Sequence, residues 1–128
     1  MESLEVSTIL PVDAPTLYAA WLSSSKHSAF TGGEATIHPK VGSKFTAWDG
    51  YISGVTVILE PDQRIVQRWR TTEFADHDPD SDLEIILEET EGGTRILLRQ
   101  TKIPAGQAKQ YELGWENHYF VPMREYFS

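Results

Sequence analysis

The segment that follows Pro104 places most of its aromatic side chains on one face of a helix, while its charged residues fall mostly on the other faces. The aromatic residues at helical spacing are Tyr111, Trp115, Tyr119 and Tyr126. This pattern predicts one long amphipathic helix, with a kink or break in its last turn because Pro122 has no amide hydrogen to donate. Such a helix must bury its aromatic face against another layer, which the residues before Pro104 have to supply.

The residues before Pro104 include runs that alternate between apolar and polar side chains, which is the period of half-buried strands. The clearest pair, Lys44 to Trp48 and Tyr51 to Leu59, flanks Asp49-Gly50, a dipeptide that favours a tight two-residue hairpin. This register sets Phe45 opposite Gly54, and a glycine within a strand marks a bend or a bulky side chain lying across the backbone. The other predicted strands are Leu4 to Leu10, Arg64 to Arg70, Leu83 to Glu88 and Thr94 to Thr101.

Two short helices are predicted between the first strand and this hairpin. Asp13 can cap a helix that has Pro15 in its first turn, and Ser24 or Ser25 can start a second helix that ends before Gly32. The order of elements predicts an α+β fold in a single domain, residues 1–128, whose curved antiparallel β-sheet is covered by the long C-terminal α-helix. A sheet that does not close completely on such a helix leaves space for a cavity of ligand size.

The composition argues against several classes of protein. A net charge of -8, without a stripe of lysines and arginines, argues against binding nucleic acid. The longest run without a charged residue, Ala14 to Ser25, has twelve residues. A bilayer-spanning helix needs about twenty, so no membrane insertion is expected. The absence of cysteines and the acidic start, which is unlike a secretory signal, favour a cytoplasmic protein.

Eight side chains are predicted to bind a ligand, because together they combine aromatic surface with a few polar or flexible groups. They are Trp48, Trp69, Arg70, Phe74, Trp115, His118, Tyr119 and Met123. For each aromatic residue the alternative is ordinary packing in the core. Trp115 is the strongest candidate for the core, because Gly114 beside it can let the helix approach the sheet closely.

Two of these assignments depend on which way a strand or helix face points. Arg70, like Arg68, lies on the strand face opposite Trp69. That face is either solvent, where the guanidinium adds solubility, or the inner face, where it could bind a ligand carboxylate. His118 lies on the aromatic stripe and is expected to be a partly buried histidine with satisfied hydrogen bonds, because Glu116 points away from it.

No motif predicts a catalytic residue, a metal or a cofactor. The acidic run from Asp76 to Asp82 does not fit a calcium-binding loop, because neither of two registers provides the required glycine. The four histidines include no pair at metal-ligand spacing on one helix. The glycine motifs that bind nucleotide phosphates are absent.

Five segments of the chain resemble, in order, the activator of heat-shock protein 90 ATPase homologue family. They are Ser28 to Gly32, Phe45 to Gly54, Ile65 to Arg70, Gly93 to Arg95 and Gly114 to Phe120. This family belongs to the START-like (SRPBCC) superfamily, so the resemblance implies a helix-grip fold, in which the sheet wraps around the C-terminal helix, and a hydrophobic pocket. The eukaryotic co-chaperone resembles this chain through its C-terminal domain only, and other members of the superfamily carry lipids and hormones or cyclise polyketides.

Three functions follow as hypotheses. The first is binding of a hydrophobic or aromatic small molecule without chemistry, with one polar handle such as His118, Tyr119 or Arg70. The second is a protein-interaction module that modulates a chaperone through its acidic surface, in a complex that salt would weaken. The third is an enzyme of the cyclase or hydrolase kind, which requires a titrating group in the cavity.

Overall fold

The computed structural model describes residues 1–128 and contains one antiparallel sheet of six strands in the order β1-β6-β5-β4-β3-β2. The strands are β1 Glu2–Leu10, β2 Lys44–Ala47, β3 Ile52–Glu60, β4 Arg64–Thr71, β5 Ser81–Thr90 and β6 Gly93–Ile103. The helices are α1 Ala14–Trp21, α2 Ser24–Thr31, α3 Ala108–Gly114, the π-helical turn η1 Trp115–Phe120, and α4 Val121–Tyr126. The predicted α+β architecture, with two short helices after the first strand, is confirmed.

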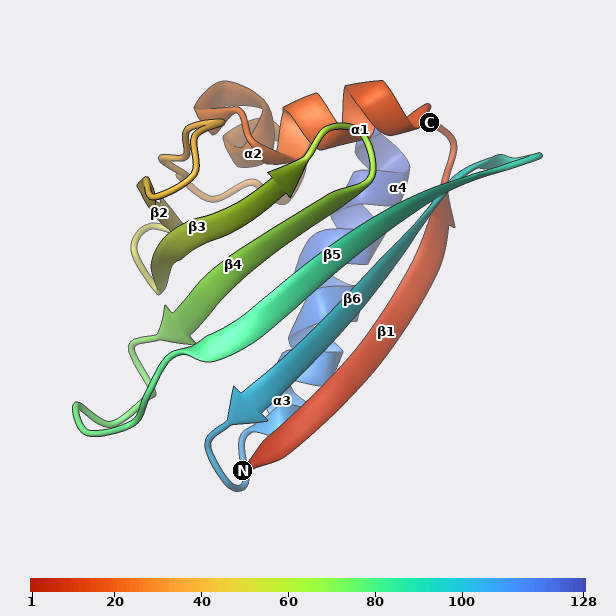
Figure 1. The fold of residues 1–128 in the computed structure, drawn as a ribbon. Helices are drawn as coiled ribbons and strands as arrows, with labels where there is room; N and C mark the ends of the chain where they lie inside the picture. The colour runs from red at the N-terminus through yellow and green to blue at the C-terminus, as the bar shows by residue number, and fades with distance from the viewer.

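The curved sheet holds the C-terminal helix against one of its faces (Figure 1). The helix runs diagonally across the strands, and α1 and α2 lie together at one end of the sheet (Figure 1). The first strand, β1, pairs with the last, β6, so the chain returns to the strand where it began before it enters the helix. No helix in the structure is both long enough and apolar enough to cross a membrane.

The inner face of the sheet and the helices enclose one core of 27 buried hydrophobic residues. Alternation along β5 and β6 buries every second residue, so that Leu83 and Ile85 point inward beside Ile96 and Leu98. The outer face of the sheet carries charge instead. A ladder of ion pairs crosses it through Glu5, Arg99, Glu84, Arg64 and Glu60, with nitrogen to oxygen distances of 2.7, 3.8, 2.6 and 3.6 Å. This ladder identifies the outer face as the solvated one.

The helix signals in the sequence are confirmed with one shift. The Asp13 carboxylate accepts a hydrogen bond from the Thr16 amide at 2.8 Å and caps α1. The second helix is capped by Ser23, whose hydroxyl accepts from the Lys26 amide. The hydroxyl of Ser24, which the sequence suggested as a cap, instead donates to the Ile37 carbonyl at 3.0 Å and ties α2 to the next segment.

The β2–β3 hairpin has the predicted register, with Ala47 opposite Ile52 and Phe45 opposite Gly54. The prediction of a two-residue loop is wrong. Strand β2 ends at Ala47 and strand β3 begins at Ile52, so the turn comprises the four residues 48–51. Two overlapping turns, with amide to carbonyl bonds from Gly50 to Ala47 at 3.2 Å and from Tyr51 to Trp48 at 3.1 Å, produce this shape. Trp48 therefore belongs to the turn and not to the strand.

The C-terminal helix continues without a break from α3 through η1 to α4, and its irregularity precedes Pro122. In η1 the Val121 amide donates to the Glu116 carbonyl, five residues back, which is the bond of a π-helical turn. Pro122 has no amide hydrogen for the His118 carbonyl, so the helix relaxes in the turn before the proline. The predicted distortion is present, as a wide turn within a continuous helix.

Gly54 has no room for a side chain, as the pairing with Phe45 predicts. A Cβ atom there would overlap the Arg68 carbonyl oxygen and lie 2.8 Å from Phe45 Cε1. We expect Gly54→Ala to lower the free energy of unfolding by about 2 kcal/mol or more, because a backbone atom cannot move aside as a side chain can. Gly92→Ala, where a Cβ meets no atom within 4 Å, is the control. Equal urea midpoints for the two variants would contradict this account.

Candidate functional site

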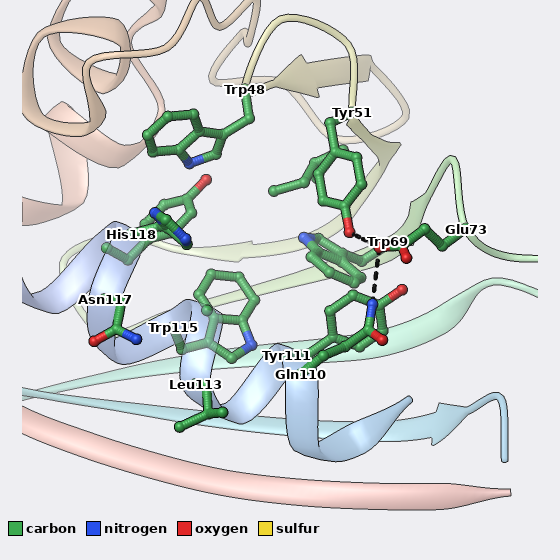
Figure 2. Close-up of a pocket in the computed structure, with 13 residues that line it drawn as sticks. Trp48, Tyr51, Trp69, Glu73, Gln110, Tyr111, Leu113, Trp115, Asn117 and His118 are labelled. Atoms are coloured by element: carbon green, nitrogen blue, oxygen red, sulfur yellow. Dashed lines mark hydrogen bonds between the residues drawn. The ribbon is translucent and has the colours of Figure 1, made fainter. Parts of the chain in front are cut away.

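A cavity of about 640 Å³ lies between the C-terminal helix and the part of the sheet formed by β3 and β4 (Figure 2). This volume is within the range of small-molecule sites, and most of the lining is apolar. The residues that line it are Trp48, Tyr51, Ile52, Trp69, Glu73, Gln110, Tyr111, Leu113, Gly114, Trp115, Asn117, His118 and Tyr119. Tyr51 and Leu113 are exposed at its rim, so the cavity opens to solvent.

The aromatic side chains from the helix are anchored on polar groups of the sheet. Trp115 Nε1 donates to Gln100 Oε1 at 2.9 Å, and the Gln100 amide donates to the Ser81 hydroxyl at 3.0 Å. Gln100 and Ser81 are fully buried, so each polar atom depends on this chain of bonds. The Tyr111 hydroxyl bonds Thr71 Oγ1 at 2.7 Å. These bonds hold the rings in the cavity wall and prevent them from filling the space.

Tyr119 is held in a third way, by a buried histidine. His27 Nδ1 lies 2.8 Å from the Trp21 carbonyl and Nε2 lies 2.8 Å from the Tyr119 hydroxyl. Burial lowers the pKa of His27 from 6.5 to about 4, so the imidazole is neutral near pH 7. Its one N–H must be at Nδ1, because a carbonyl can only accept. Tyr119 therefore donates its hydroxyl hydrogen to Nε2.

The rim near β4 carries a small polar cluster. The Tyr51 hydroxyl donates to the Glu73 carboxylate, and Gln110 Nε2 donates to Glu73 Oε2 at 2.8 Å (Figure 2). Burial and the bond to Glu73 raise the pKa of Tyr51, so its hydroxyl stays protonated. Besides the tyrosines, the lining contains one carboxylic acid, Glu73, and one imidazole, His118.

Five of the eight side chains predicted to bind a ligand line this cavity. They are Trp48, Trp69, Trp115, His118 and Tyr119. The lining also includes residues that sequence reasoning missed. Tyr111 lies on the helical stripe that the sequence showed and could have been found there. Glu73 lies in a turn after β4, and Gln110 lies on the helix beside the aromatic stripe. No pattern in the sequence brings these two residues together.

The other three predicted residues lie outside the cavity. Met123 is completely buried in the core, one turn beyond Tyr119. Phe74 is buried against Trp69, with ring centroids 6.3 Å apart. Arg70 points to the outer face, where it pairs with Asp80 at 2.8 Å and donates to the carbonyls of residues 75 and 78. Its guanidinium organises this loop and does not face the space where a ligand carboxylate could lie.

Two expectations about the helix are wrong. His118 is exposed at the cavity, and the buried histidine with satisfied bonds is His27 on α2. Glu116 does point away from His118, as expected, and pairs with Arg124 at 3.0 Å. Gly114 does not bring the helix close to the sheet, because a Cβ atom there would meet no atom within 4 Å. It lies on the stripe between Tyr111 and His118 and leaves space in the cavity wall.

The buried His27 makes stability depend on pH. Its folded-state pKa of about 4 lies below its ordinary value of 6.5, so between these values the unfolded chain binds more protons than the folded one. We expect the free energy of unfolding to fall as the pH drops from 6.5 towards 4, by on the order of 3 kcal/mol in total. His27→Gln should lose this part of the slope in urea unfolding at several pH values. Equal slopes in the two proteins would contradict the assignment.

Gly114 weakens the helix in which it lies. Its backbone is helical, at φ -63° and ψ -41°, so an alanine fits without strain. We expect Gly114→Ala to raise the free energy of unfolding by about 0.5 to 1 kcal/mol in urea unfolding. Gly32→Ala is the opposite control, because Gly32 ends α2 at φ 87° and a side chain there is strained. A loss of stability in Gly114→Ala would show that the space beside it is filled.

The cavity and fold can be compared with known proteins. Residues 11–128 match the family model "Activator of Hsp90 ATPase homolog 1-like protein". The human Activator of 90 kDa heat shock protein ATPase homolog 1 is 30% identical over 113 residues, which are 88% of this chain and 33% of the human protein. The Dictyostelium discoideum homolog is 29% identical over 119 residues, 92% of this chain and 30% of that protein. The chain thus spans about a third of the length of these relatives.

The solved structures agree on the fold. A crystal structure of an HSP90 activator from Plasmodium falciparum superposes with a TM-score of 0.89 at 21% identity, over 98% of this chain and 96% of that one. At this level of identity the likeness concerns the fold alone. The helix-grip architecture that the resemblance implied is confirmed. The chain belongs to the activator of Hsp90 ATPase homolog 1-like family and has its START-like fold.

Proposed function

We propose that residues 1–128 form one domain that binds a hydrophobic or aromatic small molecule in the cavity between the C-terminal helix and the sheet. The observation that carries this proposal is the cavity of about 640 Å³, walled by aromatic rings and open at the rim. Binding would bury apolar ligand surface, which is the main driving force for such sites. Its selectivity comes from the shape of the wall.

The rings of the wall are positioned before any ligand arrives. Trp115 is bonded to Gln100, Tyr111 to Thr71 and Tyr119 to His27. A ligand that enters therefore does not have to order these side chains, which lowers the entropy cost of binding. Of the polar handles proposed from the sequence, His118 remains available, whereas the Tyr119 hydroxyl already donates to His27.

A chaperone-associated role is the second candidate, and it uses another part of the molecule. The relatives are named as activators of the heat-shock protein ATPase, and this chain shares their family. Its net charge of -8 would draw it to a basic surface on such a partner. A complex formed in this way should weaken with added salt and should survive when the cavity is filled.

An amide-correlation NMR titration tests the first proposal. Fatty acids, sterols and flavonoid-like aromatics are added to labelled protein while the four tryptophan indole signals are followed. We expect saturable shifts at Trp48, Trp69 and Trp115, which line the cavity, and smaller ones at Trp21, which does not. Gly114→Leu should abolish them, because its side chain fills the wall where a Cβ meets only open space.

The outcomes separate the two candidates. If no compound moves the three cavity signals at millimolar concentration, the binding proposal is wrong. If Gly114→Leu still increases the ATPase rate of a heat-shock protein 90 as wild type does, and salt removes the effect, the interaction role stands without the cavity.

A further inference from the structure

Trp48 carries a hydrogen-bond donor without a partner. Its indole Nε1 is buried and makes no hydrogen bond, the only side-chain nitrogen or oxygen atom of the protein in that condition. The indoles of Trp115 and Trp21 instead reach buried glutamines, at 2.9 and 3.5 Å. A buried donor with no acceptor is unfavourable, so native proteins rarely keep one without a function.

The backbone that presents Trp48 is also strained. Trp48 and Asp49 have φ angles of 50° and 59°, in the left-handed region that bulky side chains avoid. The neighbouring segment holds them there, because the Asp49 amide donates to the Glu34 carbonyl at 3.0 Å and the Asp49 carboxylate accepts from the Glu34 amide at 2.9 Å. Strain maintained by several bonds is typical of residues that bind ligands.

The position of the ring is set as firmly as its backbone. The indole lies against Gly33, where an added Cβ would be 2.7 Å from Trp48 Cε3. A residue larger than glycine at this position would therefore displace the indole. Figure 2 shows the nitrogen on the ring edge that faces the C-terminal helix, with His118 below it. The two rings meet edge to face with centroids 5.5 Å apart. His118 is exposed and makes no hydrogen bond, so its side chain can turn away when a ligand enters.

The charges of the lining limit what the donor can bind. The cavity has no lysine or arginine, and its one carboxylate is Glu73. A ligand carboxylate would lose its hydration without a cation to pair with, which is costly in an apolar site. A neutral carbonyl oxygen accepts a hydrogen bond from an indole N–H without that penalty.

We propose that Trp48 recognises its ligand by donating the indole hydrogen to a neutral carbonyl oxygen on an aromatic molecule. This inference rests on the proposed function and adds the ligand class: aromatic ketones, quinones and related carbonyl compounds, in preference to fatty acids. His118 covers the donor until the carbonyl group displaces it.

The test compares 1-tetralone with tetralin, two bicyclic compounds that differ in the carbonyl group. Dissociation constants are measured by NMR titration for wild type, Trp48→Phe and Tyr126→Phe. The quantity of interest is the ratio of the tetralin dissociation constant to the tetralone dissociation constant. Trp48→Phe also removes apolar contact surface, but this affects both ligands alike and cancels when the ratio is compared between proteins. We expect Trp48→Phe to reduce the ratio by about tenfold. Tyr126→Phe, which removes an exposed hydroxyl on α4 outside the cavity lining, should leave it unchanged.

A second measurement needs no variant. In wild type, tetralone should move the Trp48 indole proton downfield as a hydrogen bond forms, and tetralin should not. If both compounds bind but the ratio is the same in wild type and Trp48→Phe, and no downfield shift occurs, the recognition role is overturned while ligand binding stands. If neither compound moves any signal of the cavity, this inference is overturned and the proposed function is contradicted with it.

Discussion

The hydrogen bond between Trp115 and Gln100 is the interaction on which the cavity depends. It fixes the largest ring of the helix on a buried polar residue of β6, at 2.9 Å. Without an acceptor there, the indole N–H would be buried alone, a loss of about 1 to 3 kcal/mol. Tyr111 and Tyr119 are fixed by the same principle, on Thr71 and His27. The apolar faces of these rings form the cavity wall because their polar edges are hydrogen-bonded to residues outside the cavity.

The features predicted well from the sequence are those decided by near neighbours along the chain. Strand alternation, the Asp13 cap and the pairing of Phe45 with Gly54 all follow from local steric and hydrogen-bonding rules. The site was predicted in part, because a helical stripe shows which side chains face inward but not how deep they lie. Met123 points the same way as Tyr119 yet lies in the core, since the helix meets α2 there.

The errors arose where distant segments meet. His27 gave no signal as a buried histidine because its partners, Trp21 and Tyr119, are brought to it by α1 and the C-terminal helix. Gly114 has the same φ and ψ whether it allows close packing or leaves space, so only the position of the sheet distinguishes the two. The fold of this family is compatible with many functions, and the cavity and the acidic surface can serve different ones.

The central claim is that the anchored rings keep the cavity open without a ligand. Nuclear Overhauser contacts between aromatic side chains in the ligand-free protein test it directly. The account predicts contacts between Trp48 and His118 and between Trp69 and Trp115, whose ring centroids are each 5.5 Å apart. It predicts none between Trp48 and Tyr111, which lie on opposite sides of the space (Figure 2). Strong contacts between Trp48 and Tyr111 would show that the walls collapse onto each other and would contradict the account.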